Sequence, residues 1–253
     1  MATIGNFYDY QKLLSKISQT AADEFTYGVF NPKGLFHGAG WDAGNDAIVD
    51  YAYALVSKYS DASSAAACVF YDELAELSGV SLPAAVPAEA ASISTVAKAV
   101  NFTNDETQVA NALARLVKQS GQDTTLHNAI RDGAQVAWIP SGDTCAFCIA
   151  LASNGWQHAS MRTLKGGHAK HIHANCDCCY AVRFDYNTNV AGYRPQEYKK
   201  LYDAQDGTPR DKIDAMRREF YQQNKDKINA QKRAAYQRRK ELNSSAAEEI
   251  DVN

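Results

Sequence analysis

The sequence lacks long apolar runs and lacks an N-terminal targeting segment. Its longest uninterrupted apolar stretches, such as AAACVF at residues 65–70, are far shorter than the roughly 20 apolar residues that a membrane-spanning helix requires. The N-terminus, MATIGNFYDY, has neither the basic region nor the apolar region of a secretory signal. No internal repeat of fixed period is present. These absences exclude a membrane-spanning protein and predict one that is made and kept in a reducing cytoplasm.

Cysteine is almost absent outside one short window. Five of the six cysteines, all but Cys68, fall between positions 145 and 179, and four of the six histidines lie in the same window. A disulfide framework spread across a secreted domain would not crowd its cysteines in this way. Cys68 sits among alanines and is expected to be a small core residue. The remaining composition, 45% apolar and 22% charged over 253 residues, is ordinary for a globular protein.

The formal net charge of −3 conceals an uneven distribution. From Arg210 to Glu241 there are eleven Lys or Arg residues against five Asp or Glu residues. A basic C-terminal segment on an acidic body favours a nucleic acid or an acidic surface as a partner, although a solvated helix of mixed charge would have the same composition.

The N-terminal part of the chain has helical periodicity. Residues 7–25 place apolar side chains on one face at a spacing of three to four, and residues 47–77 predict one or two Ala-rich helices with a break near Ser60 and Asp61. Helical periodicity resumes at residues 106–122, where Gly121 is expected near the helix end, and a further short helix is expected to stop around Gly133.

After Gly133 the period changes to that of strands. Residues 135–139 fit a short strand before Pro140, and the alternation in residues 177–186 predicts a second strand. We therefore predict a predominantly α-helical α+β fold. Its expected regions are an N-terminal helical region at 1–80, a linker or crossing segment at 81–105, a small α+β core at 106–205 and a basic helical tail at 206–253.

The cysteine window has the spacing of a metal knuckle. Cys145 and Cys148 form a C-x2-C pair, and a second set, His173, Cys176 and Cys178, follows as H-x2-C-x-C. Zinc sites take four such ligands, usually as two close pairs from separate parts of the chain, so the spacing predicts a structural zinc site. On a strand, Cys176 and Cys178 would point to one face and Cys179 to the other, which makes Cys179 the weakest ligand candidate. Spacing does not decide between Cys176 and Cys178.

Other chemistries fit parts of the window. One alternative is that the cysteines are free core thiols. Another is that Cys145 and Cys148 form a thioredoxin-like redox pair, but that alternative leaves the clustered His173 and Cys178 unexplained. A Cys/His nucleophile is disfavoured because no cysteine stands apart from the cluster. A metal-dependent HNH-like DNA endonuclease would use His171 or His173 beside the metal with Asn175, but the expected downstream histidine is missing.

Three stretches resemble the MuF-like minor capsid (head morphogenesis) proteins of tailed bacteriophages. They are RDGAQVAWIPSGDTCAFCIALASNGW, HIHANCDCCYAVRFD and VAGYRPQEYKKLYDA, which together cover about residues 130–204. Gly192, Tyr193, Pro195 and Tyr198 fit the family's Gly-Tyr-x-Pro-x-x-Tyr-like helix start. Two features depart from the family pattern: Cys179 stands where many relatives have Arg, and the segment after Gly207 lies outside the family core.

The resemblance implies a structural protein and not an enzyme. It implies a minor component of the virion, located in the capsid interior near the portal vertex, with the portal protein and the major capsid or scaffold proteins as partners and no membrane. The tail, residues 211–242, has strong helix formers and neither Gly nor Pro, so a long basic helix is expected. Inside a head it could contact packaged double-stranded DNA through phosphate contacts. The candidate residues are Arg217, Arg218, Lys232, Arg233, Arg238 and Arg239.

Overall fold

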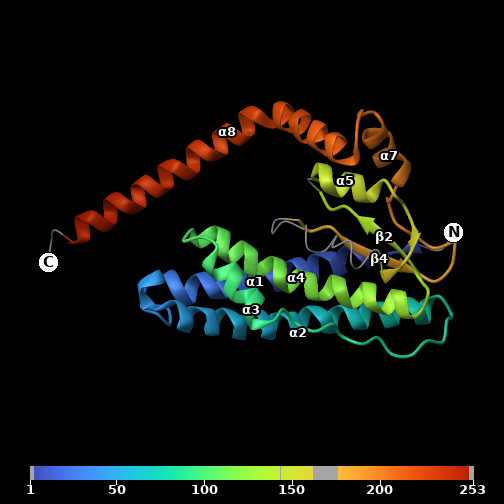
Figure 1. Ribbon diagram of the computed structural model, residues 1–253, viewed down its shortest axis with the longest axis horizontal. Helices are drawn as coiled ribbons and strands as arrows, with labels where there is room; N and C mark the ends of the chain where they lie inside the picture. Colours follow the sequence, from blue (N-terminus) through green and yellow to red (C-terminus); the bar gives the residue numbers. More distant parts are fainter. Residues whose placement is uncertain (1–2, 143, 162–175, 251–253) are drawn as a thin grey trace. The chain divides into compact units, whose positions relative to one another are not determined.

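The computed structural model describes residues 3–142, 144–161 and 176–250, with the backbone alone at residue 235 and at residues 238–250. The fold is predominantly α-helical with a small sheet, as the sequence predicts (Figure 1). The chain divides into two compact units, residues 1–199 and residues 200–253. The elements are β1 (Thr3–Ile4), α1 (Phe7–Phe30), the 3-10 helix η1 (Gly40–Ala43), α2 (Asn45–Leu77), α3 (Ile93–Asn101), α4 (Glu106–Arg131), β2 (Gln135–Ile139), α5 (Ala146–Ala152), β3 (Gln157–His158), β4 (Cys179–Arg183), β5 (Asn189–Val190), α7 (Pro195–Asp203) and α8 (Pro209–Ile250).

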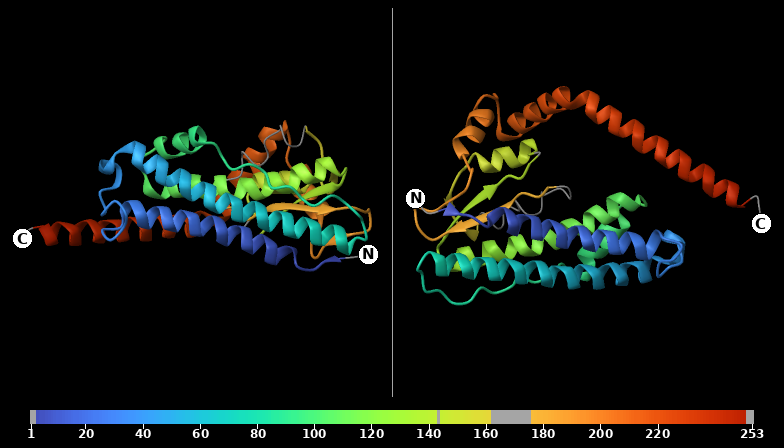
Figure 2. Two further views of the ribbon diagram at one scale, coloured as in Figure 1. Left: turned by 90° about the horizontal axis from the view of Figure 1, so that it is seen from below. Right: turned by 180° about the vertical axis from the view of Figure 1, so that it is seen from behind.

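Three long helices, α1, α2 and α4, lie side by side and form the body of the first unit (Figures 1 and 2). The buried apolar residues of the first unit form two clusters. The sheet-end cluster includes Leu14, Phe70, Leu126, Trp138 and Tyr180. The far-end cluster includes Phe25, Ile48, Val56, Val96 and Leu113. Between the two clusters each helix contributes small hydroxyl residues to a buried hydroxyl layer, Ser18, Ser60, Ser63, Ser120 and Thr124.

The expected helix breaks do not occur. The prediction of a break near Ser60 and Asp61 was wrong, because α2 continues through both positions and Ser60 is buried in the hydroxyl layer. The prediction of a helix end near Gly121 was also wrong, since α4 runs from Glu106 to Arg131 without interruption. A Cβ atom at Gly121 would lie 2.7 Å from the Oγ atom of Ser63, so the glycine permits close approach of α2 and α4. Tertiary packing therefore outweighs the local helix-breaking tendency at both places.

The sheet has the order β3-β2-β4, and β2 pairs antiparallel with both neighbours. The strands predicted at residues 135–139 and within 177–186 are confirmed as β2 and β4, with Val136 opposite Val182 and Trp138 opposite Tyr180. One face of this sheet packs on the helices, where the Phe184 ring meets the Tyr71 ring edge to face at 5.3 Å. The two-residue strands β1, β3 and β5 are too short for alternation to reveal them in the sequence.

Residues 79–92, which we call the strap, run along α4 without forming a helix or strand before α3 begins. The Asn128 side chain on α4 pairs with the strap twice: its Oδ1 accepts from the Val86 N–H, and its Nδ2 donates to the Val86 carbonyl, each at 2.9 Å. The guanidinium of Arg131 donates to the carbonyls of Pro83 and Ala84. Side chains of α4 thus replace the backbone partners that a strand neighbour would provide. The short helix α3, which the sequence analysis did not predict, then buries Val96 in the far-end cluster.

The second unit is helical. Its main element, α8, is a single helix of 42 residues, which confirms the predicted basic helix in the tail. Thr208 precedes it, with its backbone N–H and its hydroxyl both donating to the Asp211 carboxylate, while the Asp211 N–H donates back to the Thr208 hydroxyl. This reciprocal pairing is a capping box, and it fixes where the helix begins.

Candidate metal centre

Helix α5 positions the first cysteine of the cluster. Cys145 is the N-cap residue of α5, and its Sγ accepts a hydrogen bond from the Cys148 N–H at 3.5 Å. Cys148 lies in the first turn and is 1% exposed. The C-x2-C spacing therefore corresponds to a helix start, at which the first cysteine caps the helix and the second turns into the core.

The chain entering β4 positions the other two cysteines. The strand begins at Cys179, two residues later than the predicted start at Asp177, so Cys176 and Cys178 both precede it. The pairing of Cys179 with Ile139 brings Cys178 next to the chain that leaves β2. There the backbone N–H of Ser141 donates to the Cys178 Sγ at 3.4 Å.

The Sγ atoms of Cys148, Cys176 and Cys178 all lie within 4.8 Å of one another, and all three residues are buried. The Sγ atoms of Cys148 and Cys176 are 3.3 Å apart. A tetrahedral zinc ion with Zn–S bonds of about 2.3 Å requires sulfur separations of about 3.8 Å, so the cluster can hold a metal after small side-chain adjustments. Hydrogen bonds from the thiols of Cys148 and Cys176 lower the pKa of Cys178, which is where the cluster most readily bears a thiolate charge.

The other candidate ligands are not part of this three-cysteine cluster in the described residues. Cys145 is half-buried beside Cys148 but is outside the group whose sulfurs lie within 4.8 Å of one another. His173 lies outside the described residues, as does His171. Cys179 is 2% exposed and lies away from the cluster, near Gln11 and Gln122 on the helices, so it is a core thiol. The described part of the chain therefore brings together three of the five predicted metal ligands.

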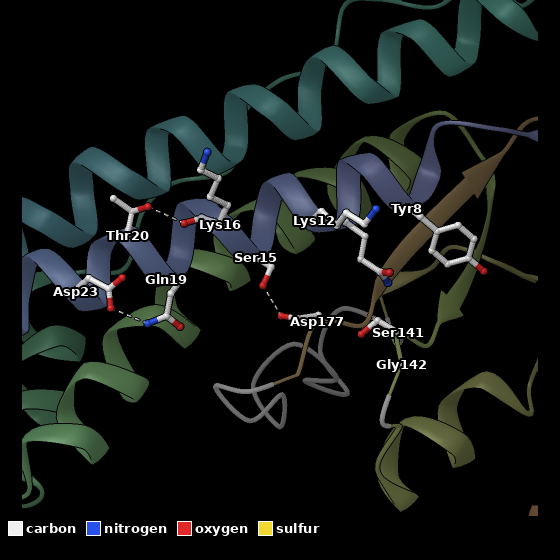
Figure 3. Close-up of a pocket in the computed structure, with 11 residues that line it drawn as sticks. Tyr8, Lys12, Ser15, Lys16, Gln19, Thr20, Asp23, Ser141, Gly142 and Asp177 are labelled. Carbon is white, nitrogen blue, oxygen red and sulfur yellow. Dashed lines mark hydrogen bonds between the residues drawn. The ribbon is translucent and has the colours of Figure 1, made fainter.

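Hydrogen bonds that the sequence did not predict connect the cluster to helices α4 and α1. Lys118 on α4 is 7% exposed, and its Nζ donates to the Cys176 carbonyl at 3.0 Å and to the Asp177 carboxylate at 2.8 Å. From α1, the Ser15 hydroxyl donates to the same carboxylate at 2.5 Å, as Figure 3 shows. Burial raises the pKa of Asp177, but the hydrogen bonds from Lys118 and Ser15 outweigh burial and lower it. Asp177, with Lys12, Lys16 and Ser15 of α1, also lines a groove on the surface (Figure 3).

The Gly-Tyr-x-Pro-x-x-Tyr element lies against the end of α5. Tyr193 is 4% exposed, and its hydroxyl donates to the Ala152 carbonyl at the end of α5, at 2.9 Å. The ring of Tyr198 stacks on that of Tyr193, with 6.3 Å between centroids. Gly192 has φ of +73°, a backbone conformation that favours glycine. This motif therefore packs against the helix that presents Cys148.

The predicted DNA-contacting residues Arg217, Arg218, Lys232, Arg233, Arg238 and Arg239 all lie on α8 in the second unit. Arg217 pairs with Asp214 one turn earlier at 3.0 Å. Arg218, Lys232 and Arg233 are exposed. For Arg238 and Arg239 the structure gives the helix position alone.

Within the described ranges, no helix combines the length and the apolar character that crossing a membrane requires. Comparison with curated proteins and with solved structures gives no match. A family model described as VG15 protein, however, matches residues 1–205. This match includes the three-helix body, the cysteine cluster and the Gly-Tyr-x-Pro-x-x-Tyr element, and it ends before α8. The chain therefore belongs to the VG15 protein family, a family of phage proteins.

Proposed function

We propose that the protein is a minor capsid, or head morphogenesis, protein of a tailed phage and that its role is structural. The observation that carries the proposal is the overlap of a motif resemblance with a family match. The stretch that resembles the MuF-like proteins, about residues 130–204, lies inside the part of the chain that the phage family model matches. In the described part of that stretch within the first unit, β2, α5 and β4 lie around the cysteine cluster.

The proposed role of the cluster is to hold a structural zinc ion. Cys148, Cys176 and Cys178 would provide three ligands, and Cys145 or His173 would provide the fourth, which closes the site to water. A bound zinc ion would join α5 to the chain entering β4, and so connect Cys148 and Cys176, which are 28 positions apart in the sequence. Structural zinc can contribute on the order of 10 kcal/mol to folding, which is comparable to the whole stability of a domain. A closed site of this kind supports a structural role and gives no reason to assign an enzymatic one.

The proposed partners are the portal protein and the major capsid or scaffold proteins, and the proposed location is the capsid interior near the portal vertex. Purified particles of the phage that encodes this chain provide the test. Mass spectrometry should detect the protein at low copy number in full heads, and a nonsense mutation in its gene should abolish infectious particles. Absence of the protein from purified heads, together with normal infectivity of the mutant, would refute the proposal.

The zinc site has its own test, in which Cys68→Ser is the matched control because Cys68 lies on α2, away from the cluster. Elemental analysis of the chain purified without added metal should find about one zinc per chain for the wild type and for the control variant. Cys148→Ser should lose most of this zinc. Retention of the full zinc content in Cys148→Ser, or a metal-free wild type that folds normally, would refute the site. Either result would leave the capsid proposal to be judged by the particles.

A further inference from the structure

The long helix α8 displays a regular row of basic positions. Arg218, Lys225, Lys232 and Arg239 recur every seven residues, and we call this set the basic row. Seven residues of an α-helix fall about 20° short of two full turns, so the four positions lie within about 60° of one another around the axis. They extend over about 32 Å along the helix, at 1.5 Å per residue. We propose that the basic row binds the phosphate backbone of double-stranded DNA.

From Arg217 onward, the acidic residues of α8 lie away from the face that bears the basic row. Glu219 and Asp226 each follow a member of the basic row by one position and so lie about 100° away from it. From Arg217 to Lys240 the helix has nine basic residues and two acidic ones, an excess of seven positive charges over about 36 Å. The face that bears the basic row is therefore strongly positive, and the acidic residues do not interrupt it.

The cations of the basic row are also available. Arg218, Lys225 and Lys232 are exposed, and within the described residues none of the three lies within 4.0 Å of a carboxylate oxygen. Arg217 and Arg210, by contrast, both pair with Asp214 near the start of the helix. The helix thus neutralises part of its charge near the N-terminal end and leaves Arg218, Lys225 and Lys232 for an external anion.

A second copy of the chain is a poorer partner for this helix than DNA. A coiled coil needs two apolar positions per heptad, whereas α8 offers one, with Tyr221, Ile228, Ala235 and Leu242 at seven-residue spacing. The positions that would complete the seam are Asn224, Gln231 and Arg238. The basic row would then lie at the edge of the seam, where an antiparallel pair would bring the rows of the two helices face to face and a parallel pair would bring Lys232 opposite Lys227, so like charges would repel in either arrangement. A membrane surface is disfavoured as well, because it requires a broad apolar face.

Double-stranded DNA matches the row in charge and in length. It has one negative charge per 1.7 Å of its axis, and the row extends over about one helical turn of the duplex. Lysine and arginine side chains are long enough to reach different phosphates from evenly spaced positions, without any particular base sequence. DNA binding by α8 rests on the second unit alone and goes beyond the proposed capsid role, since it does not require that the protein be a head component.

The test compares two variants of the full chain that lose the same number of charges. The row variant is Arg218→Gln, Lys225→Gln, Lys232→Gln and Arg239→Gln. The control variant is Lys227→Gln, Arg233→Gln, Arg238→Gln and Lys240→Gln, in which each position lies about 100° or more around the axis from the member of the row nearest to it along the helix. Glutamine keeps a high helix propensity, and circular dichroism should confirm equal helix content. Fluorescence anisotropy with a duplex of about 30 base pairs, between about 50 and 200 mM salt, then gives the affinity and its salt dependence.

Four phosphate contacts contribute about 3.6 to the slope of log affinity against log salt concentration. We expect the row variant to lose about this much of the wild-type slope, and the control variant to lose less than about 1. Equal losses in both variants would show that bulk charge alone attracts DNA and would overturn the proposal. So would a wild type that binds no DNA, one whose binding ignores salt, or one that binds polyglutamate as tightly as the duplex. Salt-resistant dimerisation through α8 in light scattering would assign the helix to a second copy.

Discussion

The buried lysine beside the cysteine cluster makes the most direct prediction about stability. Lys118→Met replaces the ammonium group with a side chain of similar length and volume, so it opens no large cavity. It removes two hydrogen bonds by which α4 holds the segment entering β4, one to the Cys176 carbonyl and one to the Asp177 carboxylate. The two lost contacts differ in their surroundings, and this difference sets the size of the effect.

The carbonyl contact should account for most of the loss. Cys176 is 4% exposed, so its carbonyl has little access to water once the lysine is gone, and a buried polar group left without its partner costs about 1 to 3 kcal/mol. The Asp177 side chain is 47% exposed and can be solvated, so the ion pair adds at most about 1 kcal/mol. We therefore expect Lys118→Met to lower the free energy of unfolding by about 2 to 3 kcal/mol.

Urea unfolding of the full chain, at a fixed excess of zinc, measures this change. Lys16→Met, an exposed lysine on α1, is the matched control and should change stability by less than about 0.5 kcal/mol. The same measurement in an Asp177→Asn background separates the two contacts, because the carbonyl contact remains there. If Lys118→Met costs no more than the control, or if its cost disappears in that background, the bridge to the Cys176 carbonyl is not what holds the segment.

Two further changes test the packing of the first unit. Gly28→Ala should destabilise the protein by about 1 to 2 kcal/mol, because the new Cβ would lie 2.6 Å from ring atoms of Tyr51 and the cost of overpacking exceeds the gain in helix propensity. Gly5→Ala is the control, since its Cβ would have no atom within 4 Å. Equal stability of the two variants in urea would refute the argument. Asn128→Ala should speed proteolytic cleavage of the strap several-fold, because the Val86 backbone loses both of its hydrogen bonds to the Asn128 side chain. An unchanged cleavage rate would mean that other contacts hold the strap.

Local sequence patterns predicted the elements that are regular and long enough to show a period. The stripe of apolar residues predicted α1 and the alternation around Val182 predicted β4, whereas the helix α5 that begins after Cys145 was not predicted. The continuity of α2 and α4 was missed because Ser60 and Gly121 are poor helix residues in isolation, and only the neighbouring helix makes them suitable.

The contacts between distant parts of the chain could not be predicted in this way. Lys118 has no feature in the sequence that distinguishes it from a surface lysine, since its partners are 58 and 59 positions away. Asn128 likewise meets Val86 across 42 positions. Of the metal ligands, the sequence could indicate the set but not the members that come together, because only the pairing of β2 with β4 places Cys176 and Cys178 against Cys148. Such pairings depend on tertiary structure and leave no local period.

The hydroxyl layer that separates the two apolar clusters has a consequence for how the protein opens. Cooperative unfolding is transmitted chiefly through continuous apolar packing, and serine and threonine side chains contribute little of it. We therefore expect the two ends of the helical body to open locally as separate units, each with its own free energy. Loss of a metal from the cysteine cluster would loosen the sheet end while amide protons around η1 and α3 stay protected from exchange. The body can in this way rearrange at one end while the other end keeps its shape.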